Sequence, residues 1–349
     1  MSELKEILAL AQHALAATEE ICVATVVRIE GSAYRRPGAR MVLTASGKRA
    51  GTVSGGCLEG EIAKKAWWLT EKGPSLQRYS SFFDDDGELP YGLGCGGTIS
   101  VLLERGEPAR LVLEALRQSL EDRNAFVIVT ATEAKAPGTQ LILREDGTAL
   151  FARNADESLL AAAHDALTRR TTGQREGAFV EYVAPPPALW IFGAGDDAQP
   201  LVEFAATLGW HVIVADGRSQ LARAERFPQA ARVLDLRAAL AEVGRDDLAV
   251  VMTHSYEQDR TALAALLPLG MKYLGVLGPR VRTERLVSEV AEQVGVSASE
   301  CLSRLHTPVG LDLGGHAPAA IALSIVAEMQ AVLAGREPRN LTVTGLIHV

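Results

Sequence analysis

The stretch Leu189-Trp-Ile-Phe-Gly193-Ala-Gly195-Asp-Asp-Ala198 decides the fold of the second half of the chain. It predicts a short apolar strand, a GxGxxA turn and a helix over residues 197–208. The first glycine permits the tight turn, the second lets a pyrophosphate approach the backbone, and Ala198 allows close helix packing. Asp216 ends the next expected strand, 23 positions after Gly193, where a dinucleotide-binding fold places an acid.

Strands and helices continue to alternate after this turn. We expect strands at residues 189–192, 211–215, 232–234, 248–253 and 272–277, with helical stretches between them. Apolar strands that alternate with helices are typical of a parallel sheet covered on both faces. The sequence therefore predicts a Rossmann-like, doubly wound domain over residues 189–349.

Two acids complicate the choice of ligand for this domain. Asp196 and Asp197 fall in the first turn of the expected helix, where a bound phosphate would otherwise gain from backbone N–H groups and the helix dipole. Carboxylates there would repel a pyrophosphate. Two interpretations stay open: a domain that binds a nucleotide-bearing ligand, and a Rossmann-type scaffold that binds no NAD.

Two further strand ends are expected at the same rim. His254 follows the strand that starts at Leu248, and Arg280 follows the strand that ends at Leu277. Groups at the carboxyl ends of parallel strands line the ligand crevice of open α/β sheets. Together they predict an anion-binding rim, although a single histidine at a strand end is more often structural.

The first half predicts a mixed α/β domain over residues 1–183. We expect helices at residues 2–20, 58–69 and 110–122, and strands at 21–29, 41–44, 98–103, 125–130, 140–143 and 149–152. Pro185-Pro186-Pro187 cannot sit inside a helix or a central strand, which makes residues 184–188 the expected linker.

Composition narrows the class of protein. The 349 residues are 48% hydrophobic and 22% charged, with a net charge of −8, which fits a globular chain and disfavours nucleic acid or an anionic membrane as partner. The four cysteines show no CxxC pair and so predict no disulfide framework. The N-terminus does not resemble a signal peptide and no apolar stretch is long enough to cross a bilayer, so we expect a cytoplasmic protein.

The first domain contains two cysteines in glycine-rich turns. Ser54-Gly55-Gly56-Cys57-Leu-Glu59 precedes an expected helix, and Gly94-Cys95-Gly96-Gly97 precedes an expected strand. Such turns expose backbone N–H groups to an anion, and a helix N-terminus favours the thiolate of Cys57. Arg35, Arg36 and Arg40 could contact phosphate. The alternative is that both thiols are small buried fillers.

These motifs, in this order, resemble the xanthine dehydrogenase accessory proteins (XdhC/CoxI-like). The resemblance runs from about residue 20 to residue 330. It rests on Gly31-Ser-x-x-Arg35-x-Pro-Gly-Ala-Arg-Met41, Gly51-Thr-Val-Ser-Gly-Gly-Cys57-x-Glu59, Gly94-Cys-Gly-Gly97, Gly193-Ala-Gly195, Asp216-Gly-Arg218, Arg226-Phe-Pro228, Thr253-His254 with Asp259, Gly275-Val-Leu-Gly278 and Pro308-Val-Gly-Leu-Asp-Leu-Gly314. Tyr34 departs from the family, which often has proline there.

The resemblance implies a non-enzymatic maturation factor. Such a protein would bind molybdenum cofactor (molybdopterin, with or without a nucleotide), shield it, assist its sulfuration by a cysteine desulfurase and insert it into an apo-molybdenum hydroxylase. Cys57 and Cys95 would then contact sulfur or molybdenum. The candidate cofactor-binding residues are Arg35, Arg40, Gly55, Gly56, Glu59, Gly94, Gly96 and Gly97 in the first domain and Gly193, Gly195, Asp216, His254 and Arg280 in the second, with no metal-ligating set.

Two other functions stay open. An NAD(P)-dependent oxidoreductase would use the Rossmann-like domain, with His254 as its one candidate proton donor. An interaction adaptor would have lost ligand binding. A homodimer is expected under the leading interpretation.

Overall fold

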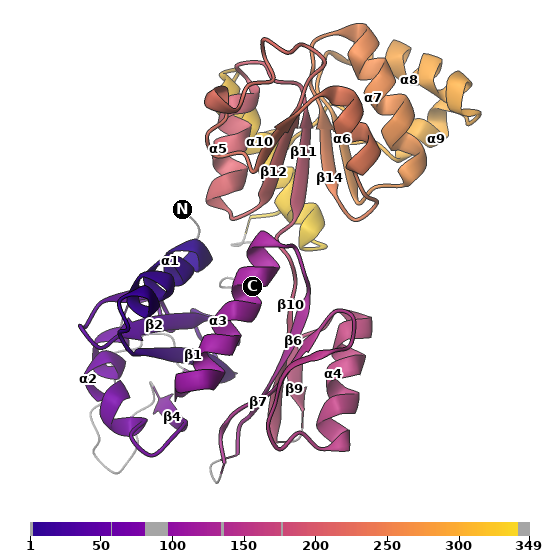
Figure 1. Ribbon diagram of the computed structural model, residues 1–349. Helices are drawn as coiled ribbons and strands as arrows, with labels where there is room; N and C mark the ends of the chain where they lie inside the picture. Colours follow the sequence, from indigo (N-terminus) through magenta and orange to yellow (C-terminus); the bar gives the residue numbers. More distant parts are fainter. Residues whose placement is uncertain (1–2, 57, 81–96, 134–135, 176, 341–349) are drawn as a thin grey trace. The chain divides into compact units, whose positions relative to one another are not determined.

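In the computed structural model the chain forms two compact units, Glu3–Pro186 and the residues from Pro187 onward (Figure 1). The structure describes residues 3–56, 58–80, 97–133, 136–175 and 177–340. Each unit has its own sheets and its own hydrophobic clusters.

The first unit is built on two antiparallel sheets of five strands. The first sheet has the order β3-β2-β1-β5-β4 and the second has the order β8-β7-β6-β10-β9. The strands of the first are β1 Ile21–Gly31, β2 Arg40–Thr44, β3 Arg49–Gly51, β4 Ser75–Ser80 and β5 Gly97–Arg105. Those of the second are β6 Phe126–Ala131, β7 Gly138–Arg144, β8 Ala149–Ala152, β9 Gly173–Arg175 and β10 Ala178–Val183.

Alternating side chains of these strands face different helices. Ile21 and Val23 of β1 join a cluster with α1 (Glu3–Ala16) and α3 (Gly106–Glu121), and this cluster also takes in one face of the second sheet. Cys22 and Ala24 face the other way, onto α2 (Glu59–Leu69). The outer face of the second sheet packs on α4 (Glu157–Arg169).

The second unit contains one parallel sheet of order β13-β12-β11-β14-β15. Its strands are β11 Ala188–Phe192, β12 His211–Ala215, β13 Arg232–Leu234, β14 Leu248–Val251 and β15 Tyr273–Val276. The helices are α5 Ala198–Thr207, α6 Leu236–Glu242, α7 Tyr256–Leu266, α8 Arg280–Val294, α9 Ala298–Ser303 and α10 Pro318–Leu333, with 3-10 turns η1 Ala224–Arg226 and η2 Leu267–Leu269. This is the predicted Rossmann-like arrangement.

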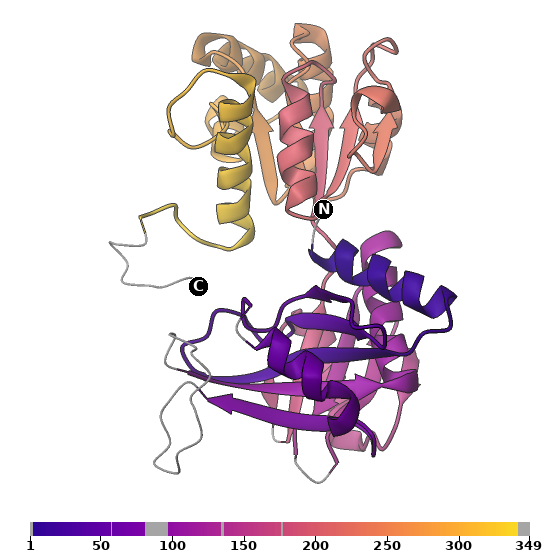
Figure 2. The same cartoon turned by 90° about the vertical axis from the view of Figure 1, so that its left-hand side faces the viewer.

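Helices cover both faces of the parallel sheet. Trp190 and Phe192 of β11 pack with α6, α7 and α8, whereas Leu189 and Ile191 pack with α5 and α10. Figure 2 shows α5 and α10 side by side on their face. Burial on both faces explains why these strands are continuous apolar runs in the sequence.

The predicted strands of the second unit agree with the structure to within two residues at each end. In the first unit the sequence did not identify β3, β4, β9, β10 or α4. The predicted helix at residues 197–208 is α5, which runs from Ala198 to Thr207 with Asp197 at its N-cap position.

The proline segment between the units is tied to the first of them. Ser119 Oγ donates to the carbonyl of Ala184 at 3.1 Å, and the Arg123 guanidinium donates to that of Pro186 at 2.7 Å. The boundary between the units falls between Pro186 and Pro187.

Gly193 is required by a close approach between neighbouring strand ends. Its φ is +135°, and a Cβ built there would lie 2.3 Å from the carbonyl oxygen of Met252, which follows β14. The carbonyl of Met252 belongs to the backbone and cannot move aside as a flexible side chain can. Only glycine therefore fits at position 193 in the turn after β11.

We expect Gly193→Ala to reduce the free energy of unfolding by about 2–4 kcal/mol, through backbone strain and overlap with Met252. Gly295→Ala is the control, because Gly295 also has a positive φ of +74° but has open space around its Cβ position; we expect about 1 kcal/mol for it. Urea unfolding measures both. Equal losses would contradict the close-approach argument.

Candidate functional site

Three loops of the first unit that lie far apart in the sequence meet at one small pocket. They are the loop after β1, the turn after β3 and the start of β5. The pocket is lined by residues 32–35, by Val53 and Ser54, and by Gly97 and Ile99. The pocket therefore brings together parts of the three N-terminal motifs singled out in the sequence.

Glycine allows these loops to touch. A Cβ on Gly97 would lie 2.0 Å from the carbonyl oxygen of Ser32, so the loop after β1 rests directly on β5. Gly55 lies under the ring of Tyr34, 2.9 Å from Cβ position to ring carbon, and has a φ of +92°. Gly56, at +121°, has nothing within 4 Å of its Cβ position.

Glu59 holds the glycine turn from below. Its Oε1 accepts hydrogen bonds from the backbone N–H groups of Val53 and Ser54, both at 2.9 Å, and its Oε2 accepts from Ser54 Oγ at 2.8 Å. Ser54 Oγ in turn accepts from the N–H of Leu58 at 2.9 Å. The Glu59 carboxylate is thus a positioning group for the turn, with its oxygens directed at the protein.

These hydrogen bonds also keep Glu59 ionised. Burial by itself would raise its pKa, but the bonds from the backbone and side chain of Ser54 and from the N–H of Val53 outweigh burial, and the pKa lies below the ordinary glutamate value. The side chain is buried with only 2% of the residue exposed. A charge buried this far is stable because three donors satisfy it.

The two predicted phosphate-binding arginines have different environments. Arg35 lines the pocket, donates to the carbonyl of Thr52 at 3.2 Å and pairs with Glu3. Arg40 is buried and forms a double hydrogen bond with Glu181 of β10, which joins the two sheets. Of the two, only Arg35 lies where it could meet a ligand of this pocket.

Cys57, Gly94, Cys95 and Gly96 lie outside the described residues. The other two cysteines are buried: burial raises the pKa of Cys22 to about 12 and also raises that of Cys301. Neither buried thiol is a nucleophile at neutral pH.

In the second unit, Asp216 is at the predicted strand end but is already hydrogen-bonded. Its Oδ2 accepts from the N–H of Ala194 at 2.9 Å and from Arg218 Nη2 at 2.7 Å. Its Oδ1 accepts from the N–H and the Nε of Arg218, both at 2.9 Å. Burial would raise the pKa of Asp216, yet these bonds lower it below the ordinary value.

Arg218 also crosses the crevice. Besides Asp216 at the end of β12, it donates to the carbonyl of Thr253 after β14 at 2.7 Å. These two strands flank β11, so the guanidinium spans the strand end that carries the glycine turn. A dinucleotide ribose at Asp216 would have to displace bonds that the protein already makes.

The two acids of the glycine turn each form a hydrogen bond with a basic side chain. Asp196 accepts from Arg226 at 2.6 Å, and Arg226 also donates to the carbonyl of Ala194 at 2.5 Å. Asp197 bonds His254 Nε2 at 2.6 Å. These contacts explain why two acids occur at this position. They join the glycine turn to the neighbouring loops at the rim, and neither side chain caps α5.

The two residues predicted for the anion-binding rim, His254 and Arg280, therefore lie in different surroundings. His254, at a left-handed φ of +59°, joins the glycine turn, whereas Arg280 lies on α8, largely exposed and paired with Glu284 on its own helix. Gly195 lies beside Asp197, at 2.5 Å from Cβ position to Oδ1.

Arg218 and Arg226 hold the rim together by hydrogen bonds to its acids and carbonyl groups, and the sequence did not predict these contacts. Both stood in quoted motifs, Asp216-Gly-Arg218 and Arg226-Phe-Pro228, but nothing in either motif indicated its partner. A second buried pair lies alongside: Asp259 accepts from Thr253 Oγ at 2.6 Å and from Arg282 at 2.5 Å.

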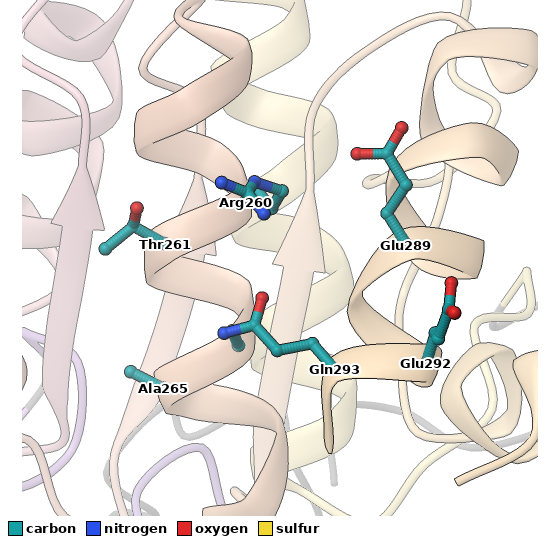
Figure 3. Close-up of a pocket in the computed structure, with 7 residues that line it drawn as sticks. Arg260, Thr261, Ala265, Glu289, Glu292 and Gln293 are labelled. Carbon is teal, nitrogen blue, oxygen red and sulfur yellow. The ribbon is translucent and has the colours of Figure 1, made fainter. Parts of the chain in front are cut away.

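A larger, polar pocket lies between α7 and α8 (Figure 3). Gln293 extends from α8 toward α7, while Arg260 pairs with Glu257 and Glu289 with Arg285, each on its own helix. Arg260 and Glu289 thus each have an ion-pair partner on their own helix.

Two kinds of feature are absent from the described residues. Within the described ranges, no helix is long and apolar enough to span a membrane. No group of three or more histidine, cysteine, aspartate or glutamate residues that could hold a metal ion occurs in the part of the chain that the structure describes.

Comparison with known proteins agrees with the fold of both units. Two family models match: the XdhC Rossmann domain over residues 189–329, and the XdhC and CoxI family over residues 14–80. A probable xanthine dehydrogenase subunit of Bacillus subtilis is 34% identical over 319 residues, or 89% of this chain and 92% of that protein.

Two further relatives are similar over nearly the whole chain. The molybdenum cofactor insertion chaperone PaoD of Escherichia coli is 27% identical over 328 residues, or 94% of this chain and 88% of that protein. The crystal structure of a xanthine dehydrogenase from Bacillus halodurans matches with a TM-score of 0.77 and 28% identity, over 97% of each chain.

We expect Glu59→Gln to reduce the free energy of unfolding by about 1–3 kcal/mol at neutral pH, because an amide cannot accept all the bonds that the carboxylate accepts. The folded-state pKa of Glu59 is lowered, so its contribution is complete above the ordinary glutamate pKa and is lost as the pH falls through the folded-state value. The variant should therefore lose stability less steeply than the wild type on acidification.

The matched control is Glu61→Gln on the same helix, since Glu61 makes a surface pair with Lys65. For Glu61→Gln we expect the free energy of unfolding to change by less than about 1 kcal/mol. Urea unfolding at a series of pH values measures all three proteins. Parallel pH profiles for wild type and Glu59→Gln would contradict the role given to Glu59.

Proposed function

Because the chain belongs to the XdhC and CoxI family, we propose that it binds molybdenum cofactor and inserts it into a xanthine dehydrogenase-type molybdenum hydroxylase. The name of the Escherichia coli relative supports the carrier role, and that of the Bacillus subtilis relative supports the class of client enzyme. The cofactor is cargo in this proposal, bound and passed on.

The observation that carries the proposal is the meeting of three loops at the pocket of the first unit. In the described part of the chain, the backbone N–H groups of Gly55 and Gly56 make no hydrogen bond. Unpaired N–H groups in a positive-φ turn suit an anion such as the cofactor phosphate. Arg35 lines the pocket, next to Ser54 at the start of this turn, and would have to exchange its pairing with Glu3 for a phosphate contact.

The exposed ring of Tyr34 adds an apolar, planar surface beside these polar groups. It lies over Gly55 with 67% of the residue exposed. A pterin ring is planar and carries polar edges, so this combination fits the organic part of the cofactor. We propose that the cofactor binds as molybdopterin or as its dinucleotide.

Cys57 gives the proposal its chemistry. It immediately follows Gly56 in the chain. A thiolate suits molybdenum or a transferred sulfur atom, and we assign sulfur or metal contact to Cys57 and Cys95. On this proposal a cysteine desulfurase supplies the sulfur, and the protein acts as a cytoplasmic homodimer.

A nicotinamide-dependent oxidoreductase is the competing function. The hydrogen bonds of Asp216 and Arg218 disfavour this function. Asp216, which would bind a ribose, is hydrogen-bonded to Arg218 and to the N–H of Ala194 in the glycine turn, which would bind a pyrophosphate. His254, its one proton donor, is bonded to Asp197. Titration with NAD is therefore the second arm of the test.

We expect the protein to carry pterin in near-stoichiometric amounts after anaerobic purification from a host that makes molybdenum cofactor. Pterin is measured by fluorescence after oxidation, and molybdenum is quantified in the same sample. Arg35→Gln should lower the pterin content several-fold, whereas Arg110→Gln, an exposed arginine on α3, should not.

Pterin at background in the wild type, even after cofactor is added directly, would overturn the carrier function. Saturable NAD binding in that sample would favour the oxidoreductase. Absence of both would favour an adaptor.

We expect Cys57→Ala to keep the pterin but to lose activation of an apo-hydroxylase, because the variant retains the backbone of the turn and removes the sulfur. Reconstitution of purified apo-enzyme measures activation. Full activation by Cys57→Ala would remove the role assigned to this residue and leave Cys95, tested by the same substitution.

A further inference from the structure

We infer that the second unit has a binding pocket for a small organic anion with an apolar body, at the amino end of its parallel sheet. The inference does not depend on the proposed function. The pocket lies between the segment that enters β15 and the segment that follows α9. The glycine turn and its ion pairs are at the opposite, carboxyl end of the same strands.

Positive charge lines this pocket. Lys272 and Arg304 contribute to its wall, together with Ser303 and His306, and no acidic side chain does. This is unusual in a chain with a net charge of −8. A concave site with cations of one sign attracts an anion.

Lys272 is the cation that is available to a ligand. The part of the chain that the structure describes contains no side-chain partner for its ammonium group, and the residue is exposed. Its backbone is fixed, since its N–H donates to the carbonyl of Arg245 at 3.0 Å. Arg304, by contrast, pairs with Glu300 one turn earlier in α9.

His306 is held in one orientation from three sides. Its backbone extends the parallel sheet beside β15: its N–H donates to the carbonyl of Leu274 at 2.9 Å, and its carbonyl accepts from Val276 at 3.0 Å. Its ring stacks on Tyr273 with centroids 4.2 Å apart. Its Nδ1 lies 3.1 Å from Oε1 of Glu328 on α10.

Glu328 is itself fixed. Its Oε2 accepts from the hydroxyl of Tyr273 at 2.5 Å and from the N–H of Gly310 at 2.9 Å. When Nδ1–H donates to this carboxylate, the tautomer is fixed and the neutral ring leaves Nε2 as a hydrogen-bond acceptor. The network therefore presents a pre-oriented imidazole at the pocket.

Apolar side chains form the rest of the wall. Leu267 and Leu274 are buried in the core of the unit, and Met271 and Leu305 pack against that core. Ligand pockets combine such an apolar surface with a few fixed polar groups. An aryl or alkyl phosphate or carboxylate has the matching chemistry, with the anion at Lys272 and the apolar body against Met271 and Leu305.

The test is calorimetric titration of the full-length protein with phenyl phosphate. We expect saturable binding with one site, weakened about tenfold or more by Lys272→Met, which removes one charge-assisted contact. Arg237→Met, an exposed cation on α6 of the same unit, is the matched control and should leave the affinity unchanged.

Three probes separate the parts of the inference. Benzoate should bind if the site accepts any aryl anion, and inorganic phosphate and benzyl alcohol should each bind more weakly than phenyl phosphate. If inorganic phosphate bound as tightly as phenyl phosphate, the apolar part of the site would be disproved. If benzyl alcohol bound as tightly as phenyl phosphate, the anion-binding part would be disproved. Absence of phenyl phosphate binding, or binding insensitive to Lys272→Met, would overturn the site, since this exposed residue can change without unfolding the protein.

Discussion

A buried carboxylate that accepts backbone N–H groups holds the glycine turn in each unit, and the arrangement of both candidate sites depends on it. Glu59 binds the N–H groups of Val53 and Ser54 below one turn, and Asp216 binds the N–H of Ala194 behind the other. A positive-φ glycine turn has few side chains of its own to hold it. A fixed, ionised acceptor supplies that constraint at the cost of a buried charge, which several donors offset.

The two turns differ in what they leave open. Around Asp216 the protein fills the rim with its own basic side chains: Arg218 joins two strand ends, Arg226 pairs with Asp196, and His254 forms a hydrogen bond with Asp197. Around Glu59 the carboxylate faces inward, and the backbone N–H groups of Gly55 and Gly56 make no hydrogen bond among the described residues. The unit with the nucleotide-type fold thus uses the groups at its rim for its own hydrogen bonds, whereas the glycine turn of the antiparallel unit keeps unpaired donors.

Much of the second unit could be predicted, because each of its strands is a short apolar run bounded by turn residues. The first unit was harder. The strand β10 pairs with β6 across more than forty intervening residues, and β4 precedes a long stretch before its partner β5, so no local pattern showed the pairing. For the candidate site, motifs predict the glycines, Arg35 and Glu59 as ligand contacts, and these stay predictions. The hydrogen bonds of Glu59 are directed inward to the turn, which no motif indicated.

The sequence by itself determined the doubly wound sheet, the two glycine turns and the family resemblance, since each depends on residues close together in the chain. Only the tertiary structure decided the partners of the charges. The motif predicts Arg40 as a phosphate contact, but Arg40 is buried and forms a double hydrogen bond with Glu181, 141 residues away in the chain. His306 and Lys272 likewise share a pocket only because the segment after α9 returns beside β15. Charge pairing depends on distance in space, and a motif records only distance along the chain.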